Sequence, residues 1–83
     1  MHREDLQKIL AGFGFAETLN KTLEGVNITH VIHFSERLRK LVEYYVDPLG
    51  IIKSVWGIWD DGAKIMENLP DIEVWLNNGA AAK

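Results

Sequence analysis

The chain of 83 residues contains no cysteine and only two prolines. Without cysteine it can form neither a disulfide nor a thiolate metal site, which are common supports of very small domains. A chain of this length makes one domain that buries only a modest part of its surface. A cysteine-free composition also fits a reducing compartment, and we expect a cytoplasmic protein.

Neither a strong charge of one sign nor a long hydrophobic run is present. The formal net charge is −3, and acids balance the lysines and arginines in the first half of the chain. Binding to duplex nucleic acid requires a basic stripe, so nucleic acid is not an expected partner. No stretch reaches the roughly 18 apolar residues of a membrane-spanning helix. The first residues carry both signs of charge, so we do not expect a secretory signal.

The familiar motifs of catalysis are missing as well. The two serines, Ser35 and Ser54, do not lie in a Gly-x-Ser-x-Gly elbow. The glycines of residues 12–14 lack the third glycine and the preceding strand of a dinucleotide-binding fingerprint. Asp60 and Asp61 are adjacent, so on a helix their side chains would point in different directions. We therefore expect no enzyme activity and no cofactor.

What the sequence does contain is an apolar run from Leu49 to Trp59, interrupted only by Lys53 and Ser54. Taken as a helix, this run is apolar on nearly every side, and such a helix must be covered. The cover has four possible sources: the rest of a small bundle, a second copy, another protein or a lipid surface.

Three segments match the spacing of apolar residues along a helix. The first covers residues 3–23, and the second begins after Asn27, a good N-cap, and runs to Val46. The third begins at residues 47–48, where aspartate precedes proline at the first helical position, and it ends before Pro70.

Three local signals qualify this prediction. Gly12 and Gly14 lie inside the first helix and could divide it into two short pieces. The aspartate-glycine pair at 61–62 could interrupt the third helix. Residues 71–76 are assigned to a further helical segment, with a short strand as the alternative, because Ile-Glu-Val-Trp alternates in polarity.

The sequence therefore predicts an all-α fold, a small three- or four-helix bundle completed by self-association. Residues 1–79 would form the single helical domain, and residues 80–83 a disordered tail.

His30 and His33 are the candidate metal ligands of this chain. On the second helix they would lie one turn apart, with Glu36 further along the same side. Two imidazoles at this spacing can share a metal, but a zinc site needs further ligands from another element. We expect no metal site unless neighbouring copies contribute such pairs.

The leading functional hypothesis is a non-enzymatic structural or interaction protein that forms a homo-oligomer through the third helix. Large aromatic residues are enriched at the energetic centres of protein interfaces, and this helix carries two tryptophans. The expected contact residues are Ile51, Ile52, Val55, Trp56, Ile58 and Trp59.

Two alternatives stay open. One is a peripheral membrane or pore-type protein whose amphipathic helices reorganise on a lipid surface. The other is a small inhibitor or adaptor that docks its acidic C-terminal half onto a basic partner protein.

Overall fold

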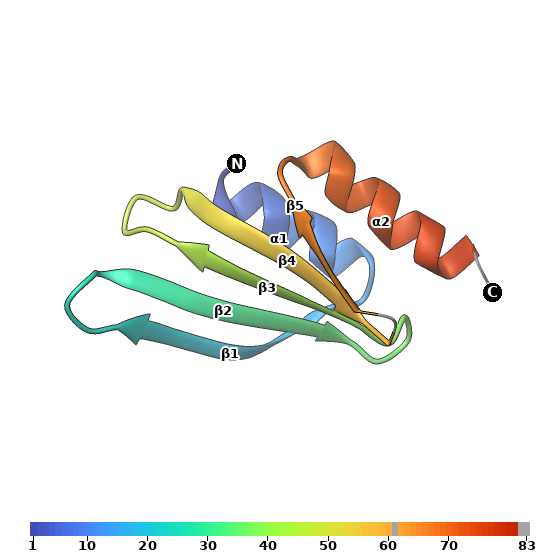
Figure 1. Cartoon of the computed structure of the whole chain (residues 1–83), viewed down its shortest axis with the longest axis horizontal. Coiled ribbons are helices and arrows are strands. Elements are labelled where there is room, and N and C mark those ends of the chain that lie inside the picture. Colours follow the sequence, from blue (N-terminus) through green and yellow to red (C-terminus); the bar gives the residue numbers. More distant parts are fainter. Residues whose placement is uncertain (61, 82–83) are drawn as a thin grey trace.

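The computed structural model describes residues 1–60 and 62–81, with side chains to residue 77. It shows a five-stranded antiparallel sheet in which each strand pairs with the next along the chain, with one helix before the sheet and one after it (Figure 1). The elements are α1 (Arg3–Gly12), β1 (Ala16–Leu23), β2 (Ile28–Ser35), β3 (Lys40–Val46), β4 (Ile52–Trp59), β5 (Gly62–Met66) and α2 (Leu69–Ala81).

The all-α prediction is wrong, and with it the helical bundle. The predicted helix over 27–46 is the β2–β3 hairpin, and most of the predicted helix over 48–69 is β4 and β5. These strands carry apolar residues on both of their sides, and a segment that is apolar at nearly every position satisfies helical spacing as well as strand alternation. Their β-branched and aromatic residues favour the strand.

The first predicted helix is real only in its first half. α1 ends at Gly12, and Gly14 follows with φ +85°. This backbone conformation is readily adopted only by glycine, so the chain turns here and continues as β1. The alternative prediction was that the glycines divide residues 3–23 into two short helical pieces. The division is confirmed, but the second piece is a strand.

The helix predicted over 71–76 is confirmed as part of α2. The side-chain oxygen of Asn68 accepts the backbone N–H of Asp71 at 2.9 Å and caps the first turn, which contains Pro70. The predicted tail at 80–83 overlaps the end of α2, and its residues 82–83 lie outside the described part of the chain.

Asp47 caps a turn instead of a helix. Its Oδ1 atom accepts the backbone N–H groups of Leu49 and Ile51, both at 2.9 Å, and Gly50 adopts φ +86° between them. Aspartate favours such local hydrogen bonds in tight turns as much as at helix starts. The aspartate-proline pair was therefore correctly identified as an element boundary, but the element that follows is β4.

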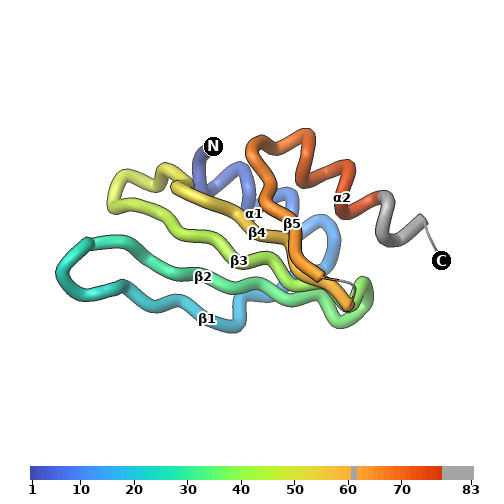
Figure 2. Tube along the Cα trace, in the orientation of Figure 1, coloured from blue at the N-terminus to red at the C-terminus, as the bar shows by residue number. Residues whose placement is uncertain are grey.

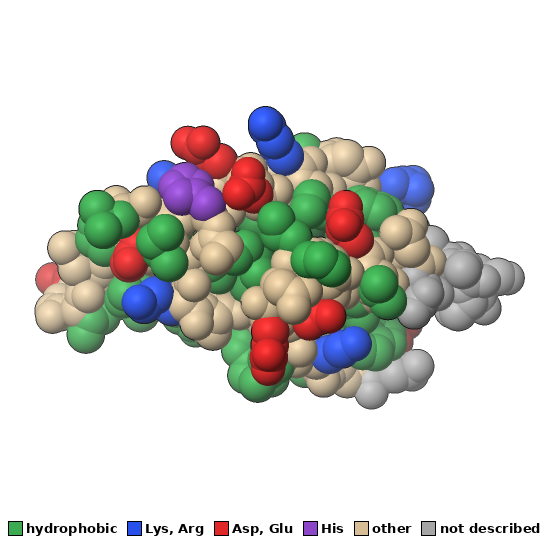
Figure 3. Space-filling model, turned by 90° about the horizontal axis from the view of Figure 1, so that it is seen from above, with side chains coloured by type: hydrophobic (Ala, Val, Ile, Leu, Met, Phe, Trp, Pro, Cys, Tyr) green, Lys and Arg blue, Asp and Glu red, His purple; other side chains and the backbone are tan. Residues whose placement is uncertain are grey.

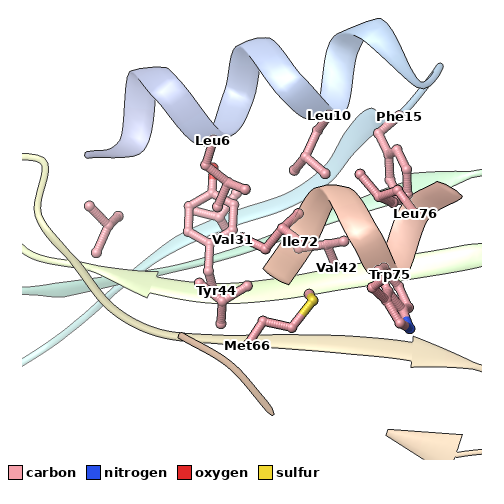
Figure 4. Close-up of a cluster of buried hydrophobic side chains, with 12 residues drawn as sticks. Leu6, Leu10, Phe15, Val31, Val42, Tyr44, Met66, Ile72, Trp75 and Leu76 are labelled. Atoms are coloured by element: carbon pink, nitrogen blue, oxygen red, sulfur yellow. The ribbon is translucent and has the colours of Figure 1, made fainter. Parts of the chain in front are cut away.

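Both helices pack on the same face of the sheet (Figures 1 and 4). Side chains alternate along each strand, so that Val42, Tyr44 and Val46 of β3 are buried under the helices while the residues between them face away. The buried apolar core consists of Leu6, Leu10, Phe15, Val31, Val42, Tyr44, Val46, Val55, Met66, Ile72, Trp75 and Leu76.

Lys40 of β3 contacts α2 through its side chain. Its side chain is buried, and its ammonium group donates to the Trp75 carbonyl oxygen at 2.5 Å and lies 4.4 Å from the centre of the Trp75 ring. A carbonyl oxygen accepts a hydrogen bond from an ammonium group, and the face of an indole ring attracts a cation. This contact explains how a lysine can be buried between a strand and a helix.

Gly57 of β4 leaves room for the Trp75 ring of α2, and its replacement should destabilise the fold. A Cβ atom at this position would lie 2.8 Å from Trp75 and 2.9 Å from Met66. We expect Gly57→Ala to lower the free energy of unfolding by about 1–3 kcal/mol, the usual cost of overpacking, in urea denaturation followed by circular dichroism.

Gly12→Ala is the matched control. A Cβ atom there meets nothing within 4 Å, and the residue ends a helix, so the substitution should leave stability unchanged or increase it. Equal stability of the Gly57→Ala variant and the unmodified protein would show that this contact is not close-packed.

Candidate functional site

The face of the sheet opposite the helices is called here the open face. Register across the strands arranges its side chains in three rows. The first row is Ala16, Phe34, Leu41, Ile58 and Ala63. The second row is Leu19, Ile32, Glu43, Trp56 and Ile65. The third row is Lys21, His30, Tyr45 and Ser54.

The first and second rows form a continuous apolar surface in contact with solvent. Phe34 is 40% exposed and Ile65 is 55% exposed, and the apolar residues between them are partly exposed. No described element packs on this face, because both helices lie on the other one. Contiguous apolar surface of this kind on a small protein marks a site where another molecule binds.

The pattern of the strands supports the same conclusion. In an antiparallel sheet with one solvated face, polar residues alternate with buried apolar ones. On β4, however, Trp56 and Ile58 face away from the helices, while Val55 and Gly57 face toward them. Strands that are apolar on both sides are typical of sheets covered on both sides.

A single ion pair interrupts the apolar rows. His30 Nε2 lies 2.6 Å from Glu43 Oε2, and the two side chains are 20% and 26% exposed. The His30 ring also stacks on Tyr45, with ring centres 4.5 Å apart and planes 6° from parallel. Because Glu43 stands in register between Ile32 and Trp56, its carboxylate is flanked by apolar side chains on both neighbouring strands.

The predicted contact residues are distributed over both faces. Trp56 and Ile58 lie on the open face, and Val55 is buried in the core. Ile52 and Trp59 pack against the core from the helix-covered side, Trp59 with its ring centre 5.4 Å from that of Trp75. The sixth residue, Ile51, is 41% exposed and pairs with His2 before β4 begins.

The hypothesis of a metal site depended on a helical arrangement of the two histidines, which the structure does not have. His30 and His33 are three residues apart on a strand, not on a helix, so they point to opposite faces of the sheet. Glu36 lies in the turn after β2. Within residues 1–60 and 62–81, no group of three or more histidine, aspartate or glutamate side chains could hold a metal ion.

On the helix-covered side, His33 belongs to a buried chain of polar groups. The Gln7 amide donates to the Tyr44 hydroxyl oxygen at 3.3 Å, and that hydroxyl lies 3.1 Å from His33 Nε2. Burial lowers the pKa of His33 and raises the pKa of Tyr44, because both charged forms lose hydration. The group joins α1 to the sheet and is shielded from substrate-sized molecules.

The start of β4 pairs with β3 but extends past the end of β5 (Figure 2). A shallow cavity of about 270 Å³ lies there. It is lined by Met1, Ile52, Lys53, Ser54, Val55, Ile65, Met66 and Glu67. Its two charged side chains, Lys53 and Glu67, are both exposed, and it contains no histidine to exchange protons. The cavity offers no constellation of groups for catalysis.

The two edges of the sheet are less suited to binding than its open face. β1 carries an irregularity between Glu17 and Leu19, and β5 is only five residues long. Bulges, charged residues and short strands at an edge discourage pairing with another chain.

Comparison with known proteins gives no direct guide, since no protein family, curated protein or solved structure matches the chain. None of the described helices is long and apolar enough to span a membrane.

Seen from above the view of Figure 1, the surface carries scattered charges of both signs among apolar side chains (Figure 3).

Sequence reasoning missed Phe34, Leu41 and Ile65 as parts of the site. A usable signal was present, because short apolar runs rich in β-branched and aromatic residues, bounded by glycine, aspartate and proline, are typical of buried strands. Applied to residues 28–35, 40–46 and 52–59, this criterion identifies three strands with two apolar sides.

Stability should decrease on acidification because of His33. Its pKa is lowered in the folded protein from the ordinary value of 6.5, so the unfolded chain takes up the proton first as the pH falls. We expect the free energy of unfolding to be highest above about pH 7 and to fall towards about pH 5, measured by urea denaturation.

The His33→Gln variant isolates this contribution. It retains a polar side chain beside Tyr44 and removes the titrating ring, so its stability should change less over the same pH range. An unchanged pH dependence in this variant would assign the effect to other groups.

Proposed function

We propose that the protein is a non-enzymatic interaction domain that forms a homodimer, with the open face of one copy packed against the open face of the other. The observation that carries this proposal is the apolar first and second rows, which run across the sheet with no element of the described chain covering them. Two such faces pack as the two sheets of a β-sandwich do.

The size of the open face supports a second copy as the occupant. With strands about 4.8 Å apart and a rise of about 3.3 Å per residue, five strands of about seven residues span roughly 550 Å². Two copies would bury about 1,100 Å² together, which reaches the range where specific interfaces begin. Transient complexes lie at this low end of interface size, so we expect a dimer that dissociates on dilution.

Charge on the open face also favours a second copy. The three rows contain one acid, Glu43, one lysine, Lys21, and one histidine, His30. A nearly neutral face meets an identical face without strong repulsion, whereas a strongly charged partner would find no complementary charge.

The two alternative functions receive less support. The adaptor hypothesis uses the acids of the C-terminal half, and its described members Asp47, Asp60, Glu67, Asp71 and Glu73 lie outside the three rows. The membrane hypothesis requires free apolar helix faces, but α1 and α2 bury theirs in the core. We retain the cytoplasm as the expected location of the proposed dimer.

Phe34→Glu and Ile65→Glu test the interface at its two most exposed apolar positions. A charge buried between two apolar faces is strongly unfavourable, so each variant should weaken the dimer by at least about tenfold while retaining the circular dichroism spectrum of the folded protein. Mass in solution, from size-exclusion chromatography with light scattering at several concentrations, measures this.

Leu49→Glu is the matched control. Leu49 is 81% exposed in the turn between β3 and β4, outside the three rows, so this variant should dimerise as the unmodified protein does. A monomeric mass of the unmodified protein at every concentration would refute the proposed function. So would a dimer that both open-face variants leave intact.

A further inference from the structure

The Glu43 carboxylate is the one acidic group of the open face, and it stands in the middle of an apolar row. Ile32 lies across from it on β2 and Trp56 on β4. Among the described residues its ion-pair partner is His30, at 2.6 Å. The charge of this carboxylate is therefore balanced only when His30 carries a proton.

Packing a second copy on this face would remove the remaining water from the pair. Burying a paired charge costs little compared with burying a carboxylate that has no counter-charge. Histidine is the side chain that ordinarily gains or loses its charge between pH 5 and 8. The electrostatic cost of forming the dimer must then depend on the protonation of His30.

The other groups around His30 do not replace it as the partner of Glu43. Across from His30 on β1 is Lys21, an exposed side chain at the sheet edge whose ammonium group can remain in water. On β3 the ring of Tyr45 stacks on His30, and on β4 Ser54 stands across from Tyr45.

Two further charged groups lie on strands near the pair. Lys53 is exposed at the irregularity of β4, where the register of β3 and β4 shifts, and its ammonium group can remain in water as that of Lys21 can. Glu17 pairs in register with His33, and both are on the helix-covered side. Glu17 carries the same charge as Glu43, so neither group replaces His30 as the partner of Glu43.

Two-fold symmetry of the proposed dimer increases the electrostatic cost of burying Glu43. In a dimer with a two-fold axis each copy contributes the same face, so both Glu43 carboxylates enter one interface. With both His30 rings neutral, two unbalanced negative charges would be buried near each other and would repel. With both rings protonated, the interface contains two neutral pairs.

We infer that the His30–Glu43 pair makes the dimer responsive to pH, so that protonation of His30 strengthens association between copies. This inference rests on the proposed homodimer and adds its regulation. Each copy takes up a proton as the dimer forms, and by linkage acidification then favours the dimer.

The test measures the dissociation constant of the dimer by sedimentation equilibrium at about pH 8 and about pH 6, the range in which histidine changes charge. We expect association to be about tenfold tighter at the lower pH, which corresponds to about 1.4 kcal/mol in the free energy of association. Circular dichroism at both pH values confirms that the protein is folded, because His33 works in the opposite direction on stability.

Two variants test whether the His30–Glu43 pair causes the pH response of the dimer. Glu43→Gln removes the charge at nearly constant size, so its dimer should be tight at about pH 8 and should gain nothing at about pH 6. His30→Gln leaves Glu43 without a counter-charge, so its dimer should be weak at both pH values. Lys64→Gln is the control, because Lys64 pairs in register with Gly57 and lies outside the three rows, so this variant should keep the response of the unmodified protein.

The outcomes separate the two proposals. A dimer of equal strength at both pH values, or a full pH response in Glu43→Gln, would overturn the inference and leave the homodimer standing. A protein that is monomeric at both pH values and in all three variants would refute the homodimer itself.

Discussion

The structure depends on strands that present apolar side chains to both faces of one sheet. Two helices of 10 and 13 residues cover one face, and no described element covers the other. On β4, Val55 packs under the helices while its neighbour Trp56 is on the open face. The described residues leave the second face uncovered, and this is the physical basis of the proposed dimer.

The helix-covered face shows how completely such a sheet can be packed. Gly57 lets the Trp75 ring approach the backbone of β4, and Lys40 holds the same tryptophan from β3. Among the polar groups enclosed here, Tyr44 is paired with both His33 and Gln7, whereas the buried Nε1 atom of Trp75 has no hydrogen-bond partner among the described residues. Since an unpaired polar group in a core costs more than a paired one gains, this arrangement lets a small core include polar side chains.

The open face differs because its polar groups stand among exposed apolar ones. Glu43 breaks an apolar row, and a buried ion pair is a poor source of net stability compared with packed hydrophobic residues. In an interface the ion pair would act differently, because any packing that separates the Glu43 carboxylate from His30 would bury an unpaired charge. In the proposed dimer the same pair would limit association under conditions that leave the histidine uncharged, so that an apolar surface could exist without permanent assembly.

The sequence alone determined two of the boundaries between elements. Residues 12–14 and Asp47 were identified correctly as points where one element ends, because glycine and aspartate act on their immediate neighbours. Pro70 was expected to end a helix, but β5 ends at Met66 and Pro70 lies in the first turn of α2. The expectation that the run from Leu49 to Trp59 needs a cover rests on composition and not on the type of element; the helices cover one side of it, and a partner for the other side stays a prediction.

Only the tertiary structure decided that these segments are strands and which side chains share a face. An apolar run with no clear period fits a helix and a two-sided strand equally, and pairing with neighbouring strands settles the choice. The same pairing aligns Phe34, Leu41 and Ile58 in one row and sends His30 and His33 to opposite faces. Register joins residues far apart along the chain, so no local pattern of residues contains it.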